Sequence, residues 1–173
     1  MGASPVRSTL VSVLKPEPGQ KLLVTFKNGT RLLALTVILH VLSSVYNGLF
    51  WMLTPLFYLG IGWALVYCGM YIWFGYRTRA GFWRGLLTGI VGVLPGVLLL
   101  ALSLLTLATS GMREGGPLWV MVPWAGPFLA LADSLPYSRF GRWMVHGSVP
   151  LAVLLTGLGS WLGRSRGEAC ARK

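Results

Sequence analysis

Few side chains in this chain could do chemistry, and the first group lies in an apolar run that begins at residue 32. His40 is followed by Ser44 and Asn47 at helical spacing, so the three residues share overlapping faces of one helix. They could line a polar path or bind an ion, because ionisable groups at membrane depth usually mark function. The competing interpretation, which we favour, is a neutral histidine that hydrogen-bonds a neighbouring helix.

A second pair of side chains, Asp133 and His146, could act as an acid and a base if both lie at the outer membrane surface. No nucleophile is tied to either residue by the spacing that hydrolases need. Two histidines and one aspartate in separate segments also lack the spacing of metal ligands. The favoured interpretation is a helix cap for Asp133 and an interfacial position for His146. We therefore expect no metal and no cofactor, and we lean against an enzyme.

The composition is typical of a membrane protein. The chain has 173 residues, of which 54% are hydrophobic and 11% are charged, and the charges cluster between long apolar runs. Its formal net charge is +11. Basic clusters beside apolar runs orient membrane spans and attract anionic lipid headgroups. We do not expect nucleic acid binding, because the aromatic residues lie in the apolar runs and not among the basic residues.

The apolar runs predict an all-α polytopic integral membrane protein with one helical domain at residues 32–163. Four stretches are long enough to cross a bilayer, at about 20 residues each. The run from residue 32 to residue 75 is long enough for two of them, so it must turn back on itself. Thr54 and Pro55 are a good start for the second helix. The predicted spans are residues 32–52, 55–76, 85–110 and 145–163.

The segment at residues 118–135 is ambiguous, because prolines and a glycine interrupt it. It could be a fifth span, or it could be a re-entrant or interfacial segment that returns to the side it came from. Lys and Arg tend to stay in the cytoplasm. Four spans place twelve of the fifteen basic residues inside, whereas five spans place ten there. We therefore favour four spans in the cell membrane, with both termini cytoplasmic, and keep five as the alternative.

The two ends of the chain are basic. Residues 1–31 are expected to be a basic segment at the cytoplasmic membrane surface, with a small hairpin around Val24, Phe26 and the Asn28-Gly29 pair as the alternative. Residues 164–173 are a short basic tail.

Glycines mark the predicted packing seam between the helices. Gly89, Gly92 and Gly96 lie on one face of the third span, where missing side chains let a neighbouring backbone come close. Their expected partner is the row of small residues at every fourth position of the second span, namely Gly60, Ala64 and Cys68. Pro95 removes a backbone hydrogen bond beside Gly96, so a bend or hinge is expected there.

These observations favour a small, non-catalytic membrane protein that acts as a subunit, scaffold or partner-binding component. Its partners would be the lipid bilayer and either further copies of itself or another membrane protein. The first alternative is a component of a small transporter or channel that uses His40, Ser44 and Asn47. The second alternative is a membrane enzyme that acts on lipid through Asp133 and His146.

Overall fold

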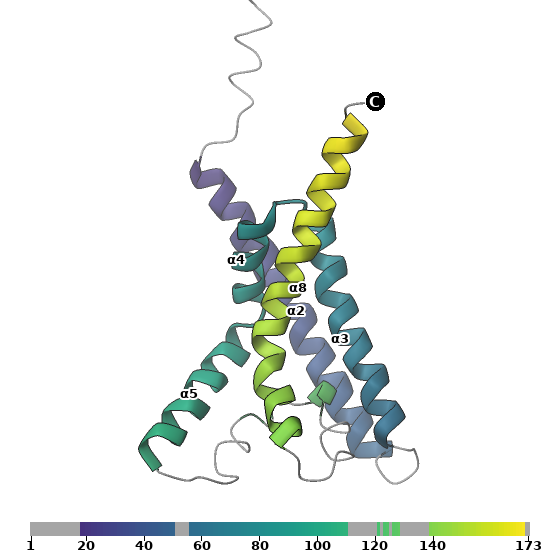
Figure 1. Cartoon of the computed structure of the whole chain (residues 1–173), viewed down its shortest axis with the longest axis vertical. Coiled ribbons are helices and arrows are strands. Elements are labelled where there is room, and N and C mark those ends of the chain that lie inside the picture. The colour runs from purple at the N-terminus through teal and green to yellow at the C-terminus, as the bar shows by residue number, and fades with distance from the viewer. Residues whose placement is uncertain are drawn as a thin grey trace, which may run out of the picture.

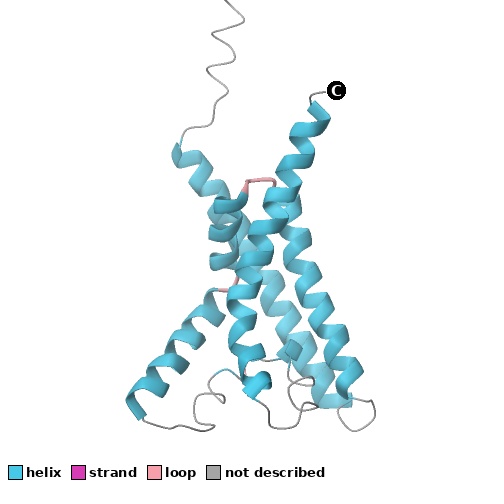
Figure 2. Ribbon diagram, viewed as in Figure 1, coloured by secondary structure: helices cyan, strands magenta, loops and turns pink. Residues whose placement is uncertain are grey.

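The computed structural model is a bundle of helices, and it describes residues 18–50, 56–110, 121, 123–124, 126–128 and 139–171. The helices are α2 (Pro18–Phe50), α3 (Leu56–Thr78), α4 (Phe82–Gly92), α5 (Leu94–Ser110) and α8 (Arg139–Ala171). No strand occurs among the described residues (Figure 2). The expected all-α class is confirmed.

Two helices are long and apolar enough to cross a membrane on their own. These candidates are Gly19–Tyr46 in α2 and Met144–Cys170 in α8. A third candidate exists if α4 and α5 together count as one span, although the pair is bent by 73°. The described residues thus contain two to three candidate membrane spans.

The surface of the bundle is strongly apolar, and its interior combines an apolar core with many small polar side chains. Large apolar side chains point outward on each helix; Leu65 is 68% exposed and Leu98 is 63% exposed. The interior instead holds many small polar side chains, which are Thr25, Thr36, Ser43, Thr88, Ser103, Ser148, Thr156 and Ser160. This distribution suits a bundle surrounded by lipid, where close packing and interhelical hydrogen bonds hold helices together.

Helix α8 is the central element, because it packs extensively against both α3 and α4 (Figure 1). Its Ser148, Ala152, Thr156 and Ser160 recur at every fourth position and are almost completely buried. Such a row of small side chains lets two neighbouring helices approach the α8 backbone. Helix α2 packs mainly against α4 on the other side of the bundle.

The contact between α3 and α8 depends on glycines in both helices. A methyl group on Gly75 would overlap the Thr156 carbonyl oxygen, and one on Gly159 would overlap the Ile72 carbonyl oxygen. A methyl group on Gly163 would likewise overlap the Tyr76 carbonyl oxygen. The turn after α3 is also tied to α8, because the Ala80 amide donates to Ser160 Oγ at 3.0 Å.

Helix α4 uses glycines against two different neighbours. A Cβ on Gly85 would lie 2.6 Å from Ser160 Cβ, and one on Gly89 would lie 3.0 Å from Val153 Cα, so both glycines face α8. Gly92 faces Leu32 of α2, whose side chain would lie 2.5 Å from the added atom. Helix α4 is thus held between α8 and α2.

The expected bend in the third span occurs at Val93, between α4 and α5. Val93 is a turn residue with φ −110° and ψ 19°, two positions before Pro95. Beyond this point α5 diverges from the other helices (Figure 1). The missing amide of Pro95 is a sufficient physical reason for a break in the helix at this place.

The N-terminal part of the chain differs from the expectation. Helix α2 begins at Pro18 and continues without a break through the proposed start of the first span at residue 32. The alternative hairpin around Val24, Phe26 and Asn28-Gly29 is wrong, because these residues lie inside α2. Gly29 does not form a turn; it makes room for Val91 of α4.

The glycine seam leads to a test within α8 itself. We expect Gly159→Ala to lower the free energy of unfolding by about 1–3 kcal/mol, because the new methyl group must displace the α3 backbone. The matched control is Gly147→Ala in the same helix, where nothing lies within 4 Å of the added Cβ. The measurement is denaturant-induced unfolding of both variants in detergent micelles. Equal stability of the two variants would refute the close contact.

Candidate functional site

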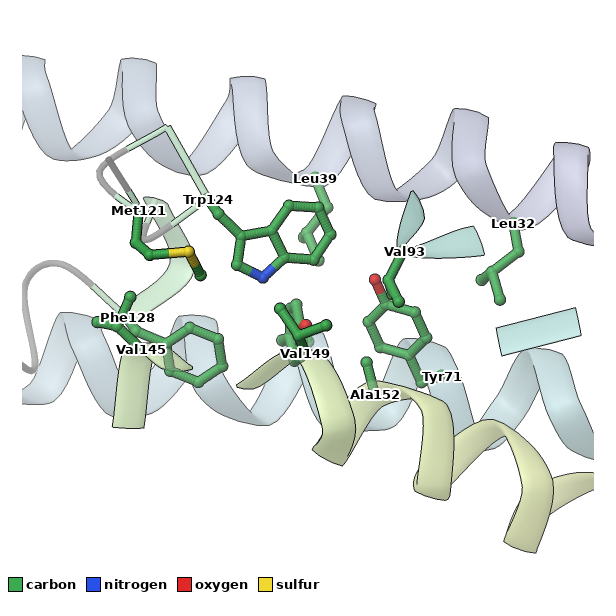
Figure 3. Close-up of a cluster of buried hydrophobic side chains, with 11 residues drawn as sticks. Leu32, Leu39, Tyr71, Val93, Met121, Trp124, Phe128, Val145, Val149 and Ala152 are labelled. Carbon is green, nitrogen blue, oxygen red and sulfur yellow. The ribbon is translucent and has the colours of Figure 1, made fainter. Parts of the chain in front are cut away.

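The interior of the bundle contains one compact cluster of aromatic and polar side chains, which we call the Trp124 cluster. Its members come from α2, α3, α8 and the short segment that includes Met121 and Phe128. Figure 3 shows three of them, Tyr71, Trp124 and Phe128, among the surrounding apolar side chains. The members are Thr36, His40, Tyr67, Tyr71, Trp124, Phe128 and Ser148. All of them are buried, with exposed fractions of 7% or less.

Trp124 lies at the centre of this cluster and contacts three helices. Its ring centroid is 4.2 Å from that of His40 in α2, and its indole Nε1 donates to Ser148 Oγ in α8 at 3.2 Å. The ring also lies against Gly96 of α5, where an added Cβ would be 2.6 Å from Trp124 Cε2. A side chain from outside the main helices therefore joins α2, α5 and α8.

Hydrogen bonds connect several polar groups around the tryptophan, whereas the buried His40 Nε2 has no partner among the described residues. Thr36 Oγ1 and the Tyr71 hydroxyl are 2.8 Å apart, and this bond connects α2 with α3. The Tyr67 hydroxyl donates to the Ser148 carbonyl oxygen at 3.1 Å, which connects α3 with α8. A polar group without a partner would be costly in an apolar interior, so these bonds also fix which side chains can meet.

The segment at residues 118–135 is described only in part, and the described part is not a continuous helix. Pro123 and Trp124 form a turn, with the Trp124 amide donating to the Met121 carbonyl at 2.9 Å. Residues 126–128 form a short helical turn. Gly126 packs against α2, because an added Cβ would lie 2.7 Å from Ser44 Oγ. The turn interrupts any helix here, and the rest of residues 118–135 lies outside the described residues, so the alternative of five spans stays a prediction.

The predicted polar path at His40, Ser44 and Asn47 does not form an open face among the described side chains. His40 donates from Nδ1 to the Thr36 carbonyl at 2.7 Å, because a carbonyl oxygen can only accept. The ring is covered by Trp124, and the edge of Tyr67 lies 6.0 Å away. The Asn47 side chain lies outside the described residues. The arrangement around His40 is that of a packed core histidine.

Only one member of the predicted acid and base pair, His146, lies in the described part of the chain. Asp133 lies outside the described residues. His146 is half-buried, and its Nε2 lies 3.0 Å from Ser103 Oγ of α5. This contact joins the diverging helix to α8. His146 therefore lies between two helices, and its expected position at the membrane surface stays a prediction.

The predicted contact between the glycines of the third span and the small residues of the second span is wrong. Gly89 meets α8, Gly92 meets α2 and Gly96 meets Trp124. In α3, Gly60 is buried, whereas Ala64 and Cys68 are half-buried and pack against the core. Helix α3 turns its large Tyr67 and Tyr71 into the core, so α8 with its row of small residues permits the closer approach to α4.

Sequence reasoning missed the residues that matter most for this interior. By residue type alone, Trp124 fits the headgroup level, and the predicted helix contacts do not include the row of small residues in α8. The spacing of Ser148, Ala152, Thr156 and Ser160 is a signal that could have revealed the row. Nothing in the sequence pairs Trp124 with His40, because 84 positions separate them.

The chemistry available to the Trp124 cluster is structural. Its side chains stack and form hydrogen bonds. The bonds of Tyr71, Tyr67 and Trp124 join two segments of the chain, whereas that of His40 lies within α2. Among residues 18–50, 56–110 and 139–171, no group of three or more His, Cys, Asp or Glu side chains could hold a metal ion. Comparison with known proteins finds no matching family model, no matching curated sequence and no matching solved structure.

The packing of Trp124 between three helices can be tested by shortening its side chain. We expect Trp124→Ala to lower the free energy of unfolding by about 3–5 kcal/mol, because it leaves a cavity between three helices. Trp161→Ala is the matched control, since Trp161 is 52% exposed on α8. Unfolding of both variants in micelles provides the measurement. A loss at Trp161 as large as the loss at Trp124 would contradict the assignment.

Proposed function

We propose that the chain is a non-catalytic, partner-binding component of a membrane assembly, with α5 as the helix that contacts the partner. The observation that carries this proposal is the divergence of α5 from the bundle. The helix is bent away by 73° after Val93, and it presents Leu98, Leu102 and Leu105 with half or more of each side chain exposed. Another membrane protein, or a second copy of this chain, would cover these side chains.

The membrane part of the proposal is four crossings of the cell membrane with both termini cytoplasmic. Helices α2, α3 and α8 would each cross once, and the bent pair of α4 and α5 would provide the fourth crossing. The start of α2 and the end of α8 lie at the same end of the bundle, which supports termini on one side (Figure 1). The arginines around the turn from α3 to α4, at Arg77, Arg79 and Arg84, support a cytoplasmic assignment for that end.

The contacts of α5 support binding rather than catalysis. Within the described chain, α5 makes few contacts with α4 and α8, and Ser103 to His146 is one of its polar contacts. A helix with apolar side chains on several faces and few contacts has room for a neighbour. The described residues do not favour the alternatives: His40 is packed against Trp124, and Asp133, the proposed partner of His146, lies outside the described residues.

Site-specific photo-crosslinking in native membranes tests this proposal. A benzophenone amino acid at Leu98 or Leu105 of α5 is expected to give a protein adduct of defined mass, because the partner covers these positions. The matched control is Leu65 of α3, which is 68% exposed and is expected to face lipid. Adducts would then be identified by mass spectrometry.

Two results would contradict the proposal. One is the absence of any protein adduct at both α5 positions. The other is a monodisperse monomer that purifies in mild detergent without any partner.

A further inference from the structure

A shallow, open depression, which we call the groove, lies on the surface between the end of α3 and the last turns of α8. Tyr76, Leu162, Ser165 and Arg166 line it. The glycine seam explains its position: Gly159 and Gly163 bring the α8 backbone against Ile72 and Tyr76. The longer side chains on either side of this seam then form the walls of the groove. The groove is therefore a consequence of how α3 and α8 pack.

Exposed tryptophans place this groove at the level of the lipid headgroups. Trp161 precedes Leu162 of the groove, and Trp73 lies one turn before Tyr76 in α3. Both indoles are 52% exposed, and tryptophan is enriched at the boundary between hydrocarbon and headgroups. The guanidinium of Arg77 lies over the Trp73 ring, 5.1 Å from its centroid. A basic side chain stacked on an exposed indole suits the same boundary.

The polar end of the groove carries positive charge. Arg166 donates from Nη1 to the Tyr76 hydroxyl at 3.4 Å, so a cation and a phenol lie side by side. The neighbouring Arg164 is paired with Glu168 at 2.7 Å, which neutralises that charge. Because Tyr76 accepts from Arg166, the hydroxyl can donate its own hydrogen to an anion that Arg166 also binds. Arg166 and Tyr76 thus offer two neighbouring donors.

The other end of the groove is apolar. Leu162 forms part of its wall, and Leu158 lies one helical turn further toward the middle of α8. Both side chains are nearly half exposed. An acyl chain that follows these leucines would run from the level of Trp161 toward the centre of the bundle. The groove therefore combines a cationic end at the headgroup level with an apolar track into the hydrocarbon.

We propose that this groove is a binding site for one anionic glycerophospholipid. Arg166 and Tyr76 bind the phosphate, and an acyl chain lies along Leu162 and Leu158. Arginine suits this role, because its planar guanidinium can donate two hydrogen bonds to a phosphate. The inference rests on the proposed membrane location, but it does not depend on α5 having a partner.

The experiment uses the full chain, purified in mild detergent and titrated with phosphatidylglycerol or phosphatidylcholine while native mass spectrometry counts bound lipid. We expect phosphatidylglycerol to bind at least about ten-fold more tightly than phosphatidylcholine, and Arg166→Gln to lose about ten-fold of that affinity. Tyr76→Phe is expected to lose less. Arg84→Gln is the matched control, because Arg84 is an exposed arginine of α4 that does not line the groove. The affinity of the Arg84→Gln variant for phosphatidylglycerol is expected to change by less than about two-fold.

Three results would contradict the proposal that the groove binds an anionic lipid. Equal losses in Arg166→Gln and Arg84→Gln would indicate diffuse attraction by positive charge. Displacement of phosphatidylglycerol by millimolar inorganic phosphate would indicate a site for the free anion. Absence of headgroup selectivity in a chain that inserts into phosphatidylcholine vesicles would also refute it. Failure to insert into those vesicles would instead refute the proposed membrane location.

Discussion

The close approach of backbones on both sides of α8 is the constraint on which the rest of the structure depends. Gly75 and Gly159 bring α3 against α8, and Gly85 and Gly89 bring α4 against the same helix. In lipid the hydrophobic effect gives little drive for helices to associate, so contact between backbones must supply much of the attraction. Small residues therefore do in this bundle what large apolar side chains do in a soluble core.

The Trp124 cluster fills the part of the bundle that this close packing leaves open. Helices α2 and α3 make few direct contacts with each other, and Trp124, Phe128 and Gly126 occupy the space beside them. The irregular backbone of this segment would be costly if lipid surrounded it. Burial against His40 and Ser148 keeps its described part within protein. The helix breaks at Val93, and Gly96 of α5 then packs on the Trp124 ring. Together these two features explain why α5 leaves the bundle.

Local signals in the sequence predicted the helices well but could not predict their partners. Glycines at Gly89, Gly92 and Gly96 indicate close contact, since a helix in lipid can use the missing side chains. The identity of the neighbour depends on which other helix presents a complementary row, and two spans of this chain do so. The choice of α3 as the partner was wrong because its Tyr67 and Tyr71 point into the core, which spacing alone does not reveal.

The break near Pro95 was predictable because proline lacks an amide. The hydrogen bond that we expected from His40 to a neighbouring helix is not the one observed, because its Nδ1 donates to the Thr36 carbonyl of the same helix. The position of Trp124 was not predictable, because an aromatic residue near prolines fits the membrane boundary as well as the core. Long-range contacts between segments decide such cases.

A disulfide trap between α3 and α8 tests the account most directly. Thr78 Oγ1 and Ser160 Oγ lie 3.2 Å apart across the two helices, so cysteines at both positions would meet. The measurement replaces Cys68 and Cys170 by serine, introduces Thr78→Cys and Ser160→Cys, and follows the crosslink in membranes by peptide mass spectrometry. The account predicts nearly complete disulfide formation under mild oxidation. Two free thiols that both react with an alkylating reagent would contradict it.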